Sequence, residues 1–224
     1  IEADSIGTKQ VPSEAYYGVQ SLRGYENFRI TGQRLRPEFI NSLAQIKKAC
    51  AICNCNVGEL DEKIKDVICQ VCDEILDGKL HDQFICDPIQ GGAGTTANMN
   101  ANEVIANRAI ELLGGEKGDY SMVHPNDHVN RAQSTNDVIP SAAKMTAAVL
   151  LKRAIEQVEK LEQALAQKEK DFHGIIKMGR TQMQDAVPIR LGAEFGAYRK
   201  AIARDIVRLN VALGEMYSIN MGGT

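Results

Sequence analysis

The sequence has no block of lysine or arginine, and the formal net charge of its 224 residues is −3. A protein that binds mainly nucleic acid or an anionic membrane normally carries a basic patch, so this composition argues against both partners. No apolar run reaches the length that crosses a bilayer. The N-terminus shows no signal-peptide pattern, and we expect a cytoplasmic protein. Because the first residue is Ile1, we also expect that the start has been trimmed.

Glycine and proline are absent from inside the two cysteine pairs, Cys50 with Cys53 and Cys69 with Cys72. The spacing of these pairs matches a generic zinc site. Zinc-binding pairs need tight turns, however, and both pairs fall within apolar stripes of helical period. Cysteine is also among the residues most often buried. We therefore interpret these residues as buried, reduced thiols of a cytosolic protein, with a zinc site as the alternative.

Several catalytic signatures are missing as well. The glycine-rich segment 88–104 lacks the lysine of a phosphate-binding loop. The sequence has no HExxH motif and no base-and-nucleophile pair of a hydrolase. His124 and His128 lie four residues apart and would need further ligands to hold a metal ion. We expect neither a metal centre nor an organic cofactor.

The sequence does contain long stretches of helical periodicity, and its 44% hydrophobic and 25% charged residues indicate a globular, mainly α-helical protein. Residues 1–35 lack a clear helical period, and we expect a loop-rich arm with one or two short strands there. One helix should begin at Pro37 and end at Gly58, and the next should be capped by Asp61 and end at Gly78. Further helices are expected over about 98–113, 138–170 and 191–216. The last two are long enough to indicate a helical bundle.

The stretch from His124 to Pro140 is unusually polar and leads directly into a long helix. Within it, Ser134 and Asp137 have the spacing of a capping box, which predicts a helix N-terminus. A helix N-terminus also offers unpaired N–H groups and a positive dipole end. Hydroxyl and amide side chains placed there could hold a carboxylate without any arginine or lysine. Two interpretations of this segment stay open: it forms only a helix cap, or it forms a cap that also binds a carboxylate ligand.

Two other polar segments share this pattern of small hydroxyl and amide side chains. Thr95 and Thr96 follow the glycines of segment 88–104 and could cap the helix that begins near residue 98. Thr181 and Gln182 lie in a polar segment, 178–188, that we interpret as a turn before the last helix. The sequence therefore predicts three polar loops, each ending at a helix start.

The same three segments carry a resemblance to a known family. QGGAGTTANMNANEVIANRA, HPNDHVN with QSTNDVIPSA, and GRTQMQDAVPIRLG closely resemble the aspartase/fumarase superfamily, and the likeness extends over essentially the whole chain. Within the superfamily the sequence is most similar to aspartate ammonia-lyases. Tyr16-Tyr17-Gly18 and Gln182 carry that distinction, because fumarases usually have Trp before this Gly and His in place of this Gln. Ala132 and Ala193 depart from the usual family residues, Ser and Gln.

The resemblance implies a fold, an assembly and a reaction. It implies an N-terminal domain of loops and helices over 1–137, followed over 138–224 by the first part of a central helical-bundle domain. It implies a cytoplasmic homotetramer whose active sites take loops from three chains. The reaction implied is the reversible deamination of L-aspartate to fumarate and ammonia, by removal of a β-proton through an aci-carboxylate intermediate. Divalent-cation activation is possible in the family.

Residue roles also follow from the resemblance. It places Thr95 near the amino group and the α-carboxylate, and it makes Ser134, Thr135 and Asn136 a substrate-holding trio. It makes Thr181 a contact of the β-carboxylate and puts Gln182 on the leaving-group side. His124 and Asn126 match a segment that forms a second dicarboxylate site in fumarases.

The family's general base is a serine on a flexible loop with a GSS…K…N signature, and residues 1–224 contain no such loop. We therefore expect an N-terminal fragment that is inactive alone. A class II fumarase is the alternative enzyme, although Gln182 counts against it. An inert helical-bundle scaffold is the alternative outside enzymes, and the intact trio Ser134-Thr135-Asn136 counts against that.

Overall fold

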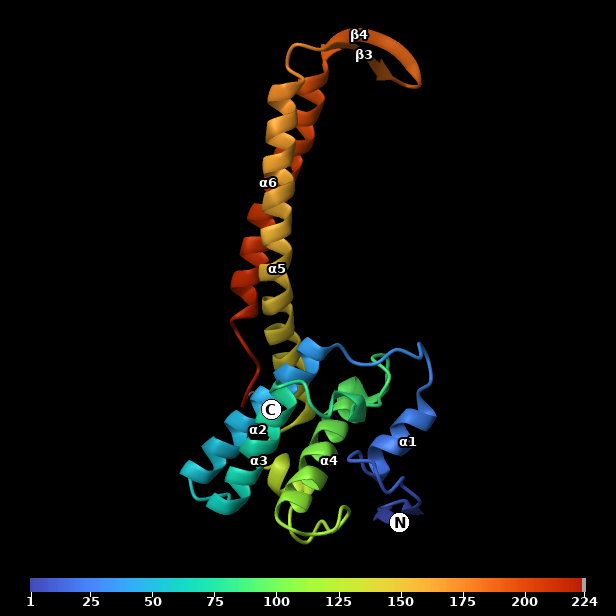
Figure 1. Cartoon of the computed structure of the whole chain (residues 1–224), viewed down its shortest axis with the longest axis vertical. Helices are drawn as coiled ribbons and strands as arrows, with labels where there is room; N and C mark the ends of the chain where they lie inside the picture. Colours follow the sequence, from blue (N-terminus) through green and yellow to red (C-terminus); the bar gives the residue numbers. More distant parts are fainter. Residues whose placement is uncertain (223–224) are drawn as a thin grey trace. The chain divides into compact units, whose positions relative to one another are not determined.

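The computed structural model describes residues 1–222 and is mainly α-helical, as the sequence predicts (Figure 1). The long helices are α1 Val19–Asn27, α2 Pro37–Asn56, α3 Glu62–Leu76, α4 Thr95–Leu112, α5 Thr135–Asp171 and α6 Leu191–Met216. Short helical turns are η1 His81–Gln83, η2 Gly92–Gly94 and η3 Pro125–Val129. The strands β1 Glu2–Asp4 and β2 Gly7–Lys9 form one antiparallel pair, and β3 Ile176–Thr181 and β4 Gln184–Arg190 form another.

The chain divides into two compact units. The first unit comprises Ile1–Thr146 and the segment that begins at Ile219, and the second comprises Ala147–Ser218. Helix α5 starts in the first unit and ends in the second. The domain boundary expected after residue 137 concerns the whole protein and stays a prediction.

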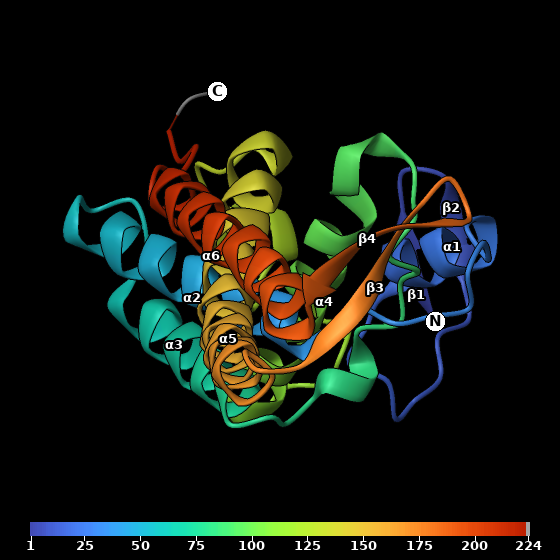
Figure 2. The same ribbon diagram turned by 90° about the horizontal axis from the view of Figure 1, so that it is seen from above.

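The core of the first unit is built from α2, α3 and α4. Helices α2 and α3 lie side by side (Figure 2), joined by a turn at Gly58. The Asp61 carboxylate accepts the backbone N–H of Lys63 at 2.8 Å, which confirms the predicted cap of α3. Fully buried apolar side chains from all three helices meet in this core, among them Leu43, Ile68, Val71, Ile75, Val104, Ile105 and Ile110.

Glu103 of α4 fastens the N-terminal arm to the core. Its side chain is 1% exposed and accepts the backbone N–H groups of Gly18, Gln20 and Ser21 at 3.0, 2.9 and 2.9 Å. These N–H groups lie at the N-terminus of α1, where backbone N–H groups have no acceptor within their own helix. A carboxylate from α4 thus caps α1 and fixes the arm, including the two short strands predicted there.

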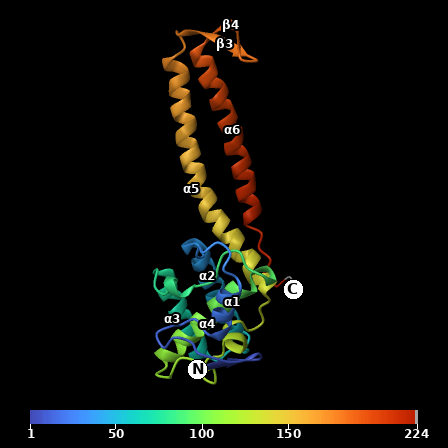
Figure 3. The same cartoon turned by 90° about the vertical axis from the view of Figure 1, so that its right-hand side faces the viewer.

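In the second unit, the later part of α5 and α6 run side by side (Figure 3). Gly192 and Gly196 allow the close approach, since a Cβ at either position would collide with α5 at Glu169. Arg199 pairs with Glu169 at 2.7 Å and with Glu162 at 3.1 Å. Large apolar side chains stay exposed along both helices, including Leu161, Val207 and Val211. Two such helices do not close a core by themselves, because each needs neighbours on its apolar face.

Candidate functional site

The glycine-rich segment places Thr95 at the first position of α4. Gly94 precedes it with a φ of +92°, and a Cβ on Gly94 would lie 2.8 Å from a methyl group of Ile139 in α5. A residue without a side chain is therefore needed for this turn to approach α5. Thr95 is exposed, and its hydroxyl donates to the Gly92 carbonyl oxygen at 2.6 Å. The start of α4 and the first turns of α5 are thus neighbours in the first unit.

The predicted cap of α4 is wrong. The helix begins at Thr95 rather than near residue 98, and neither Thr95 nor Thr96 caps it. The side chain of Gln90 does so instead, accepting the backbone N–H of Ala97 at 2.6 Å, while its own amide N–H donates to Asp87 O at 2.8 Å. The glycine-rich turn folds back and brings a residue seven positions upstream to the helix start, which a local capping rule does not capture.

The predicted capping box at the start of α5 is confirmed. Ser134 Oγ accepts the N–H of Asn136 at 3.2 Å, and the Asp137 carboxylate accepts the N–H of Ser134 at 3.2 Å. The backbone carbonyl oxygen of Asn136 accepts the side-chain N–H of Asn220 at 2.9 Å. Within residues 1–222 the half-buried hydroxyl of Thr135 has no hydrogen-bond partner. The cap therefore uses Ser134 and leaves Thr135 free to bind a ligand.

His124 and Asn126 lie in the turn η3, and the histidine has a structural role there. Its Nδ1 accepts the N–H groups of Asn126 and Asp127 at 3.2 and 3.1 Å, which leaves the ring proton on Nε2. The N–H of His124 in turn donates to His128 Nδ1 at 2.8 Å, and partial burial lowers the pKa of His128. His124 and Asn126 border one cavity of about 280 Å³ together with Asp4 and Glu103. Their role as a second dicarboxylate site stays a prediction.

Thr181 and Gln182 lie in the second unit, at the tip of the β3–β4 hairpin. The interpretation of segment 178–188 as a turn leading into a helix is therefore wrong, since α6 begins at Leu191. The hairpin is closed by Gln182 and Met183, whose φ angles are +49° and +62°. Such a two-residue turn normally carries glycine or asparagine. Strained backbone of this kind often occurs at ligand-binding sites. The Thr181 side chain is exposed.

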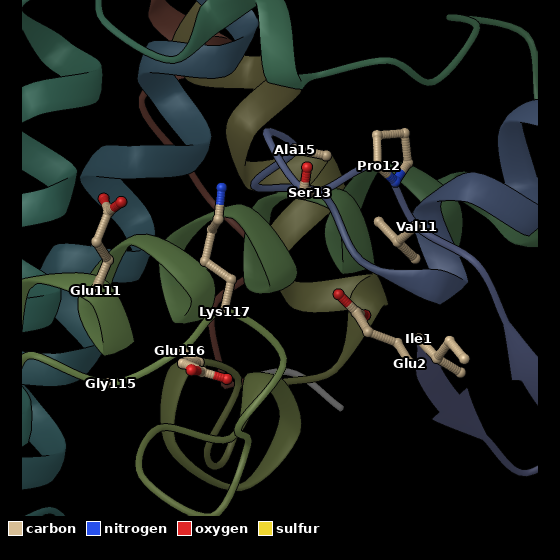
Figure 4. A pocket seen from close by; sticks show the side chains of 10 residues that line it. All are labelled: Ile1, Glu2, Val11, Pro12, Ser13, Ala15, Glu111, Gly115, Glu116 and Lys117. Carbon is tan, nitrogen blue, oxygen red and sulfur yellow. The ribbon is translucent and has the colours of Figure 1, made fainter.

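Another cavity of the first unit lies away from the predicted site residues. It has a volume of about 410 Å³, lies beside the N-terminal arm (Figure 4) and is lined by Glu2, Glu111, Glu116 and Lys117 among others. Its three carboxylates disfavour an anionic ligand. Among residues 1–222 no group of three or more His, Cys, Asp or Glu side chains is arranged to hold a metal ion, and the four paired cysteines form no such group. No helix of that part of the chain could span a membrane.

A buried lysine was not anticipated from the sequence. Lys47 of α2 is 0% exposed and donates to Asn98 in α4 and to Asn130 and Gln133 before α5. It lies four residues after Leu43 and three before Cys50, on the apolar stripe of its helix. The signal in the sequence that could have indicated its burial was the position of this lysine on an apolar stripe. Glu103 was also missed, because its partners are in a distant segment.

The first unit thus carries two adjacent helix N-termini with hydroxyl groups, and helix N-termini suit anionic ligands. The sequence model of a family described as lyase matches residues 7–224. The chain belongs to the lyase family. Its curated relatives include an aspartate ammonia-lyase of Bacillus sp, 54% identical, and one of Escherichia coli strain K12, 41% identical. Both alignments cover 100% of this lyase chain and 48% of the relative. The chain therefore spans about half the length of these relatives.

Solved structures agree with the fold of this lyase chain. The fumarate lyase:delta crystallin from Brucella melitensis superposes with a TM-score of 0.94 at 45% identity, covering 99% of this chain and 52% of that one. A class II fumarase from Schistosoma mansoni superposes with a TM-score of 0.90 at 35% identity, covering 100% and 47%. The resemblance to the aspartase/fumarase superfamily is confirmed.

Proposed function

We propose that the protein containing this chain is an aspartate ammonia-lyase, which converts L-aspartate reversibly to fumarate and ammonia. The observation that carries the proposal is the pair of neighbouring helix N-termini in the first unit, which present Thr95 and Thr135. It is supported by relatives named aspartate ammonia-lyase at 41–54% identity over the whole chain. Hydroxyls, amides and helix N-termini suit a substrate with two carboxylates.

The chemistry explains why such donors are needed. Removing a proton from Cβ of aspartate leaves a carbanion, whose charge spreads into the β-carboxylate as a doubly charged aci form. Expulsion of the amino group from Cα then gives fumarate. Fixed donors aimed at the developing charge stabilise it in a site from which water is excluded, and losing one such donor typically costs about 3–4 kcal/mol. Each hydroxyl in the proposed site can provide one donor.

The proposal assigns roles to individual residues. Thr95 contacts the amino group and the α-carboxylate, and Ser134, Thr135 and Asn136 hold the substrate. Thr181 contacts the β-carboxylate, and Gln182 lies on the leaving-group side. The strained backbone at Gln182 supports its assignment, and the Thr135 hydroxyl, which has no hydrogen-bond partner within residues 1–222, supports that of Thr135.

The assembly and the general base belong to the same proposal. Residues 1–224 contain no GSS…K…N segment, so the proton acceptor would come from other residues of the whole protein. A homotetramer with sites shared between chains would cover the apolar side chains exposed on α5 and α6. The cytoplasmic location and the domain boundary after residue 137 are further parts of the proposal.

A class II fumarase is the second candidate, favoured by the likeness to the Schistosoma mansoni enzyme. Gln182 counts against it, since an amide cannot replace the histidine usual at this position in fumarases. The test is fumarate formation by the protein extended to the length of its relatives, with L-aspartate and L-malate as separate substrates. We expect fumarate from L-aspartate alone. Fumarate from L-malate alone would identify a fumarase, and activity on neither would favour a structural scaffold.

A further inference from the structure

Lys47 is a fully buried lysine whose three N–H donors all bind uncharged side chains. Its Nζ lies 2.8 Å from Asn98 Oδ1, 2.8 Å from Asn130 Oδ1 and 2.9 Å from Gln133 Oε1. No carboxylate is among its hydrogen-bond partners in the described part of the chain. Buried lysines are normally paired with an acid, so this arrangement leaves a positive charge without a partner of opposite sign.

The hydrogen bonds of the three amides fix their orientation around Lys47. The amide N–H groups of Asn130 and Gln133 donate to the carbonyl oxygens of Gln133 and Val129 at 3.0 and 2.9 Å. Asn98 donates to Asn130 Oδ1 at 3.2 Å. All three amide oxygens therefore face Nζ. An ammonium has three donors for three acceptors, whereas a neutral amine has a lone pair that would face an oxygen.

Two thiols act electrostatically on Lys47. Cys50 lies on its own helix and Cys72 on α3, and burial raises the pKa of both thiols, which favours their neutral form. Asp137 in the first turn of α5 lies near Cys50 and binds the N–H of Ser134. Helix α4 and the loop before α5 contribute the three neutral amides. Burial lowers the pKa of Lys47 itself to about 7.

The partners of Lys47 belong to the two proposed substrate-binding segments. Asn98 lies one helical turn after Thr95, and Gln133 directly precedes Ser134. We propose that Lys47 is a positioning residue that ties the start of α4 to the start of α5 and supplies the positive charge that draws a doubly negative substrate to the hydroxyls of these segments. This inference rests on the proposed function, because it names the source of charge for that same site.

The physical reason is that the one cation within the hydroxyl segments, Arg131, is already paired with Glu59. A dicarboxylate must lose much of its hydration on binding, and helix N-termini contribute only partial charges. A full charge buried behind the site is weakly screened, because little water separates it from the ligand. The charge acts on a dianion about twice as strongly as on a monoanion. By the same coupling, a bound dianion favours the charged form of Lys47.

The test compares Lys47→Met with Lys48→Met in the protein extended to the length of its relatives. Lys48 is the adjacent residue, and it pairs with Asp73 on the protein surface, so it controls for loss of a lysine from α2. We expect Lys47→Met to raise KM for L-aspartate by about tenfold or more and to weaken binding of succinate more than that of butyrate. We also expect the wild-type KM to rise above pH 7 and the variant to lose this dependence. Wild-type kinetics in Lys47→Met would overturn the proposal.

A second variant covers the case in which Lys47→Met does not fold. Gln133→Glu gives Lys47 an anionic partner, which neutralises its charge while the two segments stay tied, but the Val129 carbonyl oxygen loses its amide donor. We therefore expect a folded protein with a lower thermal stability and a KM raised by several-fold. A KM within twofold of wild type would overturn the role of the charge. If the wild-type protein turns over neither substrate, the proposed function fails, and succinate binding by calorimetry in the same variants decides the role of Lys47.

Discussion

Ser21 donates both its backbone N–H and its hydroxyl to the buried carboxylate of Glu103, the first at 2.9 Å. Two further N–H groups of α1 bind the same carboxylate. The α1 helix is thus capped by a residue more than eighty positions later in the chain, and the position of the whole N-terminal arm depends on one charged side chain.

Glu103→Gln should destabilise the first unit. The amide NH₂ group of Gln would face N–H donors, so at least one backbone N–H would lose its acceptor, at a cost of about 1–3 kcal/mol. Urea unfolding measures the effect, with Glu116→Gln as the control because Glu116 is exposed. Equal stability of the two variants would mean that the arm does not depend on this cap.

The pH dependence of stability should reflect Lys47. Its pKa is about 7 in the folded chain against an ordinary 10.5, so between these values the unfolded chain holds a proton that the folded chain lacks. The free energy of unfolding should therefore rise with pH from about 7 towards 10, by up to about 1.4 kcal/mol per pH unit. Lys47→Met removes this contribution, so the difference between the two unfolding curves isolates it. A difference that stays constant with pH would contradict the assignment.

Ser134 and Thr135 should separate stability from binding. Ser134→Ala removes the cap of α5 and should cost about 1 kcal/mol of stability. Thr135→Val removes a hydroxyl without a partner in the described residues, so stability should change by less than about 0.5 kcal/mol while dicarboxylate binding weakens. Thermal unfolding and succinate titration of both variants check the pair. Unchanged binding in Thr135→Val would remove it from the site.

Thr181→Val should leave the fold intact and weaken dicarboxylate binding. The side chain is exposed at the hairpin tip, so nothing in the second unit depends on its hydroxyl. We expect KM for L-aspartate to rise by about tenfold or more, since one hydrogen bond to a charged group is lost. Thr8→Val in β2 is the matched control, an exposed strand threonine outside the proposed site. Unchanged kinetics would remove Thr181 from the substrate contacts.

The cysteines should differ in reactivity. The interpretation of all four paired cysteines as buried is wrong for Cys53, which is exposed. Cys72 and Cys86 are buried, and burial raises the pKa of Cys86 to about 12 and that of Cys72 further. Because the thiolate is the reactive form, a maleimide at pH 7 should label Cys53 first and reach Cys72 and Cys86 only after unfolding. Mass spectrometry of the labelled peptides gives the order. Early labelling of Cys72 would contradict the packing of α3.

Local signals in the sequence were enough to predict α2 and α3. Pro37, Gly58 and Asp61 act within a few residues of the helix ends that they define, and the structure has each in the predicted place. The capping box of Ser134 and Asp137 is local in the same way. Apolar periodicity likewise predicted the long helices α5 and α6.

The features that were missed depend on contacts between distant segments. Gln90 reaches the start of α4 only because the glycine-rich turn folds back. The β3–β4 hairpin turns at Gln182 and Met183, neither of which is a usual residue at positive φ. The burial of Lys47 was missed although it lies on the apolar stripe of α2, because that burial depends on three amides contributed by other segments.

The most direct test of the proposed reaction is its reverse in deuterated water, followed by proton NMR. The protein extended to the length of its relatives would be given fumarate and ammonium. We predict L-aspartate with one deuterium at Cβ, because nitrogen adds to Cα and the base returns a deuteron to Cβ. Deuterated malate as the product, or aspartate without deuterium at Cβ, would contradict it.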